Sequence, residues 1–176
     1  MKRALIFGAV LSCVFFGADA TPAEAPAPLA ESDFVFTLGG REYRLGDVAQ
    51  PLIRQAESLC GEFEEQAADS CMFAGQDKEF GNEALLIATY PIGPEGEDVV
   101  ETILVQREGF PTARGIGVGS AKSEVIAAYG EAFTLDYDQM IYAMGDPVIE
   151  PVLVFELDLT TDCVSMFFMM RNTAGQ

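Results

Sequence analysis

The sequence has no histidine and no tryptophan, and its 176 residues include only 10 Lys and Arg against 28 Asp and Glu. Without histidine, Ser-His-Asp and Cys-His mechanisms, imidazole metal sites and the commonest general base are excluded. The formal net charge of −18 and the isoelectric point near 4.1 argue against nucleic acid and against an anionic membrane surface as ligands. These absences favour a small acidic binding module over an enzyme.

The first twenty residues have the organisation of a secretory signal peptide. A short basic head precedes an almost entirely apolar run over 4–17, and Ala18-Asp19-Ala20 has the small-x-small pattern of a cleavage site. The apolar run is short for a membrane span. We therefore predict that residues 1–20 are a signal peptide and that the protein is exported. The mature chain then carries 8 basic and 27 acidic residues, a formal charge of −19.

Cys13 opens a second route of processing. It follows Val10-Leu11-Ser12, which loosely resembles a bacterial lipobox, in which the cysteine becomes a lipidated N-terminus. Leu11 and the apolar residues after the cysteine depart from that pattern, so simple secretion is favoured. On either route we expect the protein outside the cytoplasm, secreted or tethered to the outer face of the cytoplasmic membrane. The membrane would be contacted only through the lipid.

The export segment is followed by a spacer and one folded domain. Residues 21–32 are rich in Pro and Ala and lack apolar periodicity, which is typical of a semi-extended linker. Residues 33–176 are long enough for a single domain with its own hydrophobic core.

Turn signals and periodicity divide this domain into short elements. Two alternating runs flank Gly39-Gly40, which predicts a β-hairpin because a two-residue primed turn needs positive φ. Apolar residues three and four apart predict one helix that ends at Gly61 and a second that begins after Ser120 and ends at Gly130. Seven further strands are predicted, at 70–74, 84–90, 99–106, 133–138, 140–144, 152–158 and 163–170.

The two halves of the domain agree in outline. Each is predicted to hold one helix followed by three or four antiparallel strands, over about 45–110 and 111–172. A single unit of this kind cannot bury its sheet alone. The sequence therefore predicts an α+β fold, a tandem repeat of one helix plus three or four antiparallel strands with an N-terminal β-hairpin.

Two segments resemble known proteins. Residues 70–78, followed by Thr89-Tyr90-Pro91, and residues 112–120, running on to Tyr129-Gly130, resemble uncharacterised exported, often lipid-anchored, proteins of anaerobic Gram-positive bacteria. The helix that starts after Gly-Ser and ends in Tyr-Gly is also similar to the β-lactamase-inhibitor-protein-like fold, which small outer-membrane assembly lipoproteins share. The resemblance covers most of 34–170. It implies binding of other proteins across an open sheet face and brings no catalytic residues.

Cysteine chemistry and metal binding have little support in the sequence. Export permits disulfides, and a bond between Cys60 and Cys71 would join the first helix to the next strand, stabilising the fold by about 2–3 kcal/mol. Cys163 begins an apolar strand and is expected to be a buried thiol. No Cys-x-x-Cys pair or calcium-loop spacing occurs, and the glycine-rich run at 115–119 fails the phosphate-loop spacing. We predict no catalytic residue, no cofactor and no metal site.

The most apolar predicted strand supplies the candidate binding face. Met166, Phe168 and Met170 alternate with Phe167 and Met169, so the two sets point to opposite faces of the strand. One set is expected to be buried, and the other to report on partners. We select Met166, Phe168 and Met170 as the candidate binding set, because methionine and aromatic side chains form adaptable contact surfaces.

These observations predict an exported, non-enzymatic binding or interaction module that contacts a protein or cell-envelope component through an exposed sheet face. Two alternatives from other classes stay open. A hydrolase or lyase using carboxylates alone would need two Asp or Glu about 5–10 Å apart in a cleft, one of them with a raised pKa. An extracellular solute- or cation-sensing domain would show a melting temperature that depends on calcium.

Overall fold

The computed structural model describes residues 25–70, 73–92, 96–147 and 150–171. The predicted signal peptide, its cleavage site and Cys13 lie outside these residues, and so does Cys71. Within the described ranges, no helix is long and apolar enough to cross a membrane.

The chain enters the fold through a short 3-10 helix, Glu31–Phe34, and a hairpin formed by β1 (Val35–Leu38) and β2 (Arg41–Arg44). The turn is the predicted Gly39-Gly40 pair, whose φ angles are 59° and 79°. Both angles lie in the left-handed region that residues with a Cβ seldom adopt, so glycine permits this two-residue turn. The predicted hairpin is confirmed.

The first helix, α1, spans Gln50–Cys60. Pro51 lies in its first turn, where a missing backbone N–H costs nothing, and the helix ends at Gly61 with a φ of 94°. Its buried face consists of Leu52, Ile53 and Ala56. The predicted end of this helix is therefore confirmed.

The second helix, α2, spans Lys122–Tyr129 and ends at Gly130, as predicted. Its N-cap is Ala121 rather than the predicted Ser120. The Glu124 carboxylate accepts a hydrogen bond from the Ala121 N–H at 2.8 Å, while Ser120 Oγ accepts one from the preceding loop. The acidic residue in the first turn thus replaces the expected hydroxyl cap.

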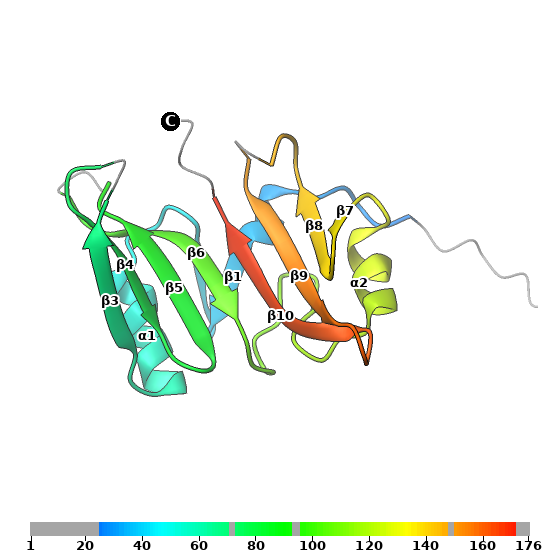
Figure 1. Ribbon diagram of the computed structural model, residues 1–176, viewed down its shortest axis with the longest axis horizontal. Helices are drawn as coiled ribbons and strands as arrows, with labels where there is room; N and C mark the ends of the chain where they lie inside the picture. Colours follow the sequence, from blue (N-terminus) through cyan, green and yellow to red (C-terminus); the bar gives the residue numbers. More distant parts are fainter. Residues whose placement is uncertain (1–24, 71–72, 93–95, 148–149, 172–176) are drawn as a thin grey trace, which may run out of the picture.

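The remaining strands form one eight-stranded antiparallel sheet in the order β3-β4-β5-β6-β10-β9-β8-β7 (Figure 1). Their bounds are β3 Glu64–Asp69, β4 Gln76–Gly81, β5 Leu85–Tyr90, β6 Val99–Val105, β7 Thr134–Asp136, β8 Gln139–Ala143, β9 Val152–Asp158 and β10 Cys163–Met170.

The predicted fold class is wrong. The described chain is mostly sheet, with two short α-helices, and not a tandem repeat of helix-plus-strands units. The reason is the pairing of β6 with β10, from Val105 opposite Phe167 to Thr102 opposite Met170. These backbone bonds and one shared core make the eight strands a single sheet.

Two strands were missed by the sequence analysis. β3 is exposed along its whole length, and β4 contains only one large apolar residue, Phe80. Neither has the apolar alternation that identifies a half-buried strand. The strand predicted at 70–74 is not among the described strands, and residues 71–72 of it lie outside the described ranges.

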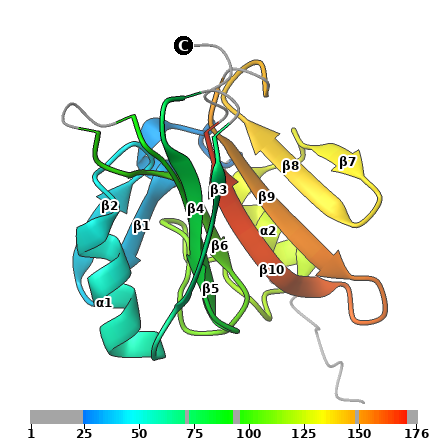
Figure 2. The same cartoon turned by 60° about the vertical axis from the view of Figure 1, so that its left-hand side comes forward.

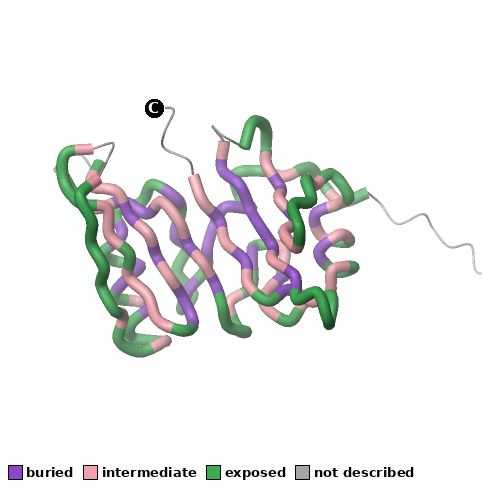
Figure 3. The backbone as a smooth tube through the Cα atoms, in the orientation of Figure 1, coloured by how far each residue is buried: buried purple, intermediate pink, exposed green. Residues whose placement is uncertain are grey.

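Both helices and the hairpin cover one face of the sheet (Figure 1, Figure 2). The core lies between these layers, and its fully buried members include Phe36, Leu52, Ile103, Phe155 and Phe167. Buried backbone runs along the central strands, while the edge strands β3 and β7 are exposed (Figure 3). No helix or strand of the described chain lies over the opposite face, which we call the open face.

Residues 25–30, part of the predicted spacer, lie against the helical side of the body. The Arg114 guanidinium donates hydrogen bonds to the carbonyl oxygens of Ala27 at 2.7 Å and Pro28 at 2.9 Å. It also forms an ion pair of 2.6 Å with the buried carboxylate of Asp33 and lies 4.8 Å from the ring centre of Tyr129. One cation therefore holds the N-terminal segment, the 3-10 helix and α2 together.

Candidate functional site

The candidate binding set lies on the open face. Met166, Phe168 and Met170 are half-buried there, whereas Phe167 and Met169 are fully buried in the core. A register shift between Val164 and Met166 places Val164 on the core side as well. The structure therefore brings the three selected side chains to the one face of β10 that no described element covers.

Phe168 lies at the centre of an apolar row that crosses five strands. In the cross-strand register it is opposite Leu104 of β6 on one side and Val154 of β9 on the other. The row continues to Leu86 of β5 and Ile141 of β8. Directly opposed side chains on one sheet face are about 4.5–5.5 Å apart at Cβ, so these five form a continuous surface, which we call the apolar row.

The apolar row is packed tightly by its own members. Val154 is only 3% exposed although no backbone element covers it, while its neighbours in the row are half-buried. A second line of side chains runs beside the row on the same face, consisting of Ala88, Thr102, Met170, Val152 and Ala143. The centre of the open face is therefore a contiguous surface built mainly from apolar side chains.

A hollow of about 390 Å³ adjoins the apolar row over β3 to β6. Three carboxylates line it, those of Asp77, Glu79 and Glu101, together with Gln66 and Tyr90. We call it the acidic hollow. Its acids come from two non-adjacent strands, β4 and β6, and the register shift after Ala88 helps to bring Glu101 to the same face as its neighbours.

The electrostatics of the acidic hollow are unfavourable in the free protein. Burial raises the pKa of Glu101 above its ordinary value, the nearby Asp77 and Glu79 raise it further, and a hydrogen bond with Tyr90 opposes these effects. One carboxylate oxygen of Asp77, Oδ1, is buried and has no hydrogen-bond partner within the described structure. A buried acceptor without a donor costs free energy, so the Asp77 carboxylate destabilises the folded state.

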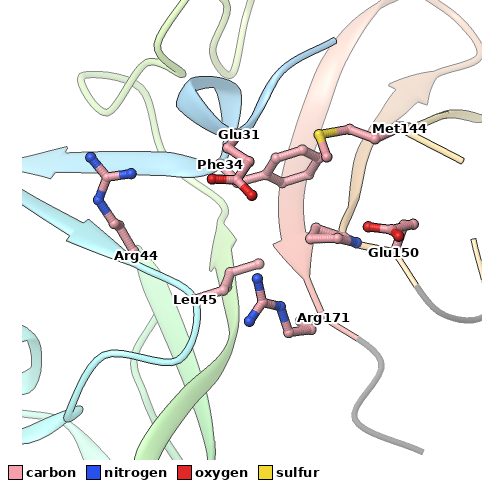
Figure 4. A pocket seen from close by; sticks show the side chains of 8 residues that line it. Glu31, Phe34, Arg44, Leu45, Met144, Glu150 and Arg171 are labelled. Atoms are coloured by element: carbon pink, nitrogen blue, oxygen red, sulfur yellow. The ribbon is translucent and has the colours of Figure 1, made fainter. Parts of the chain in front are cut away.

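A smaller recess of about 100 Å³ lies where the hairpin meets the ends of β9 and β10 (Figure 4). Phe34 and Leu45 form its apolar floor, and Arg171 points toward Leu45. Charged side chains of both signs line it, namely Glu31, Arg44, Glu150 and Arg171. Its size leaves room for little more than solvent, so it is a weaker candidate than the open face.

The cysteines do not form a described site. Cys60 is half-buried at the end of α1 and forms no disulfide with another described cysteine, and burial raises the pKa of its thiol, with Arg107 acting in the opposite direction. Cys163 is also half-buried, which is less buried than predicted. The pairing of Cys60 with Cys71 involves a residue outside the described ranges and stays a prediction. Among the described residues, no group of three or more His, Cys, Asp or Glu could hold a metal ion.

Sequence reasoning found only one strand of this site. Leu86, Leu104, Val154 and Ile141 were missed because they alternate with buried apolar residues, so both faces of their strands read as core. The acids of the acidic hollow were also missed, because β4 has no apolar alternation that would predict a strand and so place Asp77 and Glu79 on one face. The Glu101-Thr102 pair within an apolar run was the one available signal that β6 has a partly solvated face.

No protein-family model matches the chain, and no curated protein matches its sequence. Among solved structures, it is similar to a cysteine-rich secretory protein from Staphylococcus aureus, with a TM-score of 0.48 and 12% sequence identity. The match covers 85% of this chain and 48% of that protein, so the chain spans about half the length of its structural neighbour. A similarity of this degree carries no argument, and the family resemblance noted in the sequence stays a prediction.

Proposed function

We propose that this protein is a non-enzymatic binding protein that contacts another protein through the open face of its sheet. The observation that carries the proposal is the apolar row, which crosses five strands on a face that no described element covers. Removing apolar surface from water is favourable by roughly 25 cal/mol for each Å² buried. A partner that covers the apolar row would therefore form a complex stabilised by that burial.

The face of the sheet is a better contact surface than its edges. Strand addition would require β3 or β7, the two edge strands. β3 carries Glu64, Glu65 and Asp69, and charged residues on an edge strand disfavour pairing with another strand. β7 is only three residues long. Side-chain contacts across the open face are therefore the proposed mode of binding, and we place this role outside the cytoplasm because of the predicted signal peptide.

Site-specific photo-crosslinking tests the proposal. A benzophenone amino acid replaces Met166 on the open face in one sample and Glu57 on the exposed side of α1 in the other. Each protein is incubated with cell-envelope extract from the source organism and irradiated. We expect a discrete crosslinked protein from position 166 and none from position 57, because only the first probe lies beside the apolar row.

Leu104→Asp is the matched loss-of-function variant. It places a charge in the middle of the apolar row, on the half-exposed side of β6, and circular dichroism establishes that the variant is folded. We expect it to abolish the crosslink from position 166. A crosslink of equal yield from both positions, or one that persists in the folded Leu104→Asp variant, contradicts the proposal.

The acidic hollow favours a second candidate function, a hydrolase that uses carboxylates alone. Three carboxylates line one hollow, and the raised pKa of Glu101 is the property expected of a general acid. Tyr90 opposes this role, since its hydrogen bond favours the ionised form of Glu101. Hydrolysis of a chromogenic glycoside panel that is lost in Glu101→Gln would support this candidate, and absence of turnover across the panel would remove it.

A further inference from the structure

The charged groups of the open face all have one sign. Alternation along the paired strands, together with the register shift at Glu101, places several carboxylates on that face, around and beside the apolar row. Gln139, also on this face, donates a hydrogen bond to one of them, Glu156, at 3.3 Å. These carboxylates belong to Glu64, Asp77, Glu79, Glu101, Asp136, Glu156 and Asp158.

The described cations are all placed elsewhere. Five belong to the hairpin, the helices or the Asp33 ion pair on the covered side: Arg41, Arg44, Arg54, Arg114 and Lys122. Lys78 is among the residues that line the acidic hollow, but its ammonium pairs with Asp98 at 2.8 Å, and alternation directs its side chain away from those of Asp77 and Glu79. Arg107 lies over the ring of Phe110, and Arg171 faces the small recess of Figure 4. None of the eight described Lys and Arg side chains lies on the open face.

The negative charge of the open face indicates which kind of partner could bind there. A second copy of the chain would bring the same carboxylates against each other, and like charges across an interface cost several kcal/mol. A cationic surface would instead be attracted to the rim of the apolar row. The carboxylates of Asp77, Glu79 and Glu101 line the acidic hollow together, and an incoming ammonium or guanidinium group would offset their mutual repulsion.

We propose that the partner is a basic protein surface whose apolar centre covers the apolar row and one of whose Lys or Arg side chains enters the acidic hollow. This inference rests on the proposed function and adds the chemistry of the partner. The apolar row contributes burial of surface, and the carboxylates contribute orientation and a faster association.

A random peptide library displayed on phage is the probe. It is selected against the purified chain from Thr21 onward, and the bound peptides are sequenced and then tested against Phe168→Ala, which truncates the centre of the apolar row. We expect the Phe168-dependent peptides to combine large apolar residues with Lys or Arg. Their affinity is expected to fall about tenfold or more in Glu79→Gln/Glu101→Gln.

The matched control is Glu42→Gln/Glu57→Gln, which removes the same charge from the covered side of the molecule. It should leave the affinity of those peptides within about twofold, because exposed distant charges are screened. Phe168-dependent peptides without Lys or Arg enrichment, or equal losses in the two double variants, overturn this inference and leave the proposed function standing. A selection that yields no Phe168-dependent peptide overturns both.

Discussion

At the scale of single residues, the few cations of this acidic chain have structural roles. Arg114 binds the Asp33 carboxylate and three backbone carbonyl oxygens, those of Ala27, Pro28 and Ala128. Lys78 is held by Asp98, and this hydrogen bond raises the pKa of the lysine. Each of these contacts therefore uses one of only ten Lys and Arg residues in the sequence.

Arg114→Ala is expected to lower the free energy of unfolding by about 3 kcal/mol, because it leaves the carboxylate of Asp33, 4% exposed, without its counter-charge. Urea denaturation measures the change. Arg54→Ala, on the exposed side of α1, is the control and should change stability by less than about 0.5 kcal/mol. A loss at Arg114 no larger than that at Arg54 would show that the ion pair is not a structural anchor.

Glu101 gives a prediction that depends on pH. Its pKa is raised above the ordinary 4.5, first by burial and then by Asp77 and Glu79, so the folded state holds the proton more tightly than the unfolded state. Stability is therefore lost as pH rises from about 4.5 through the raised pKa. Glu101→Gln removes this cost, and we expect it to raise the melting temperature near neutral pH but not below about pH 4.

The control for this prediction is Glu57→Gln, which makes the same charge change at an exposed position of α1. Its effect reports the general relief of negative charge, and the difference between the two variants isolates the acidic hollow. Scanning calorimetry at the two pH values provides the measurement. The interpretation is wrong if the two variants shift the melting temperature equally near neutral pH.

At the scale of elements, turns and apolar strands could be predicted from the sequence, and solvated edges could not. The hairpin at Gly39-Gly40 and the glycine ends of both helices follow from local backbone chemistry, which acts over a few residues. β3 and β4 are strands only because β5 offers them an edge to pair with. Their own residues are polar, so no periodicity marks them.

The hairpin turn gives a prediction at this scale. Alanine at either turn glycine has to adopt a positive φ, at a cost of roughly 1–2 kcal/mol. A Cβ at Gly39 would also meet the side-chain amide of Gln55, whereas a Cβ at Gly40 would meet nothing within 4 Å. We therefore expect Gly39→Ala to destabilise more than Gly40→Ala in urea denaturation.

Gln55→Ala distinguishes the two causes of this difference. In its background the amide of Gln55 is gone and only the Leu59 methyl group, 3.3 Å from a Cβ at Gly39, remains, so the difference between the two glycine substitutions should shrink. Gly40→Asn should be milder than Gly40→Ala, because asparagine tolerates left-handed backbone. Equal costs at the two glycines in the wild-type background would contradict the contact with α1.

The candidate site could be predicted only in part, because it depends on the pairing of strands that are far apart in the sequence. Alternation within one strand separated Met166, Phe168 and Met170 from the buried Phe167 and Met169. The apolar row depends on the register of five strands, and the pairing of Phe168 with Leu104 joins positions more than sixty residues apart. Such long-range register is set by the shared core, so a single sequence does not reveal it.

At the scale of the whole molecule, the excess of negative charge destabilises the folded state. The full chain has a formal charge of −18, and the described structure contains three ion pairs, one of them on the exposed hairpin at 3.8 Å. Repulsion among the remaining carboxylates destabilises the folded state and is screened by salt. Added salt should therefore stabilise the folded state, because it weakens this repulsion.

We expect the melting temperature near neutral pH to rise as sodium chloride increases from about 20 mM to about 500 mM. Differential scanning fluorimetry measures it, and sucrose at matched osmolality controls for general effects of the cosolute. Arg114→Ala should show the same rise, because its ion pair is buried and little screened. A melting temperature that falls with salt would mean that attractive pairs outweigh the repulsion.

The position of β10 in the sheet bears on how the protein is made. β10 is the last strand along the described chain, yet it lies at the centre of the sheet between β6 and β9. Until residues 163–170 are present, those two neighbours have unpaired edges and the core lacks Phe167 and Met169. The eight-stranded sheet therefore cannot close until residues 163–170 have been synthesised and are free to pair. Before that point the earlier strands form two separate groups, β3 to β6 and β7 to β9.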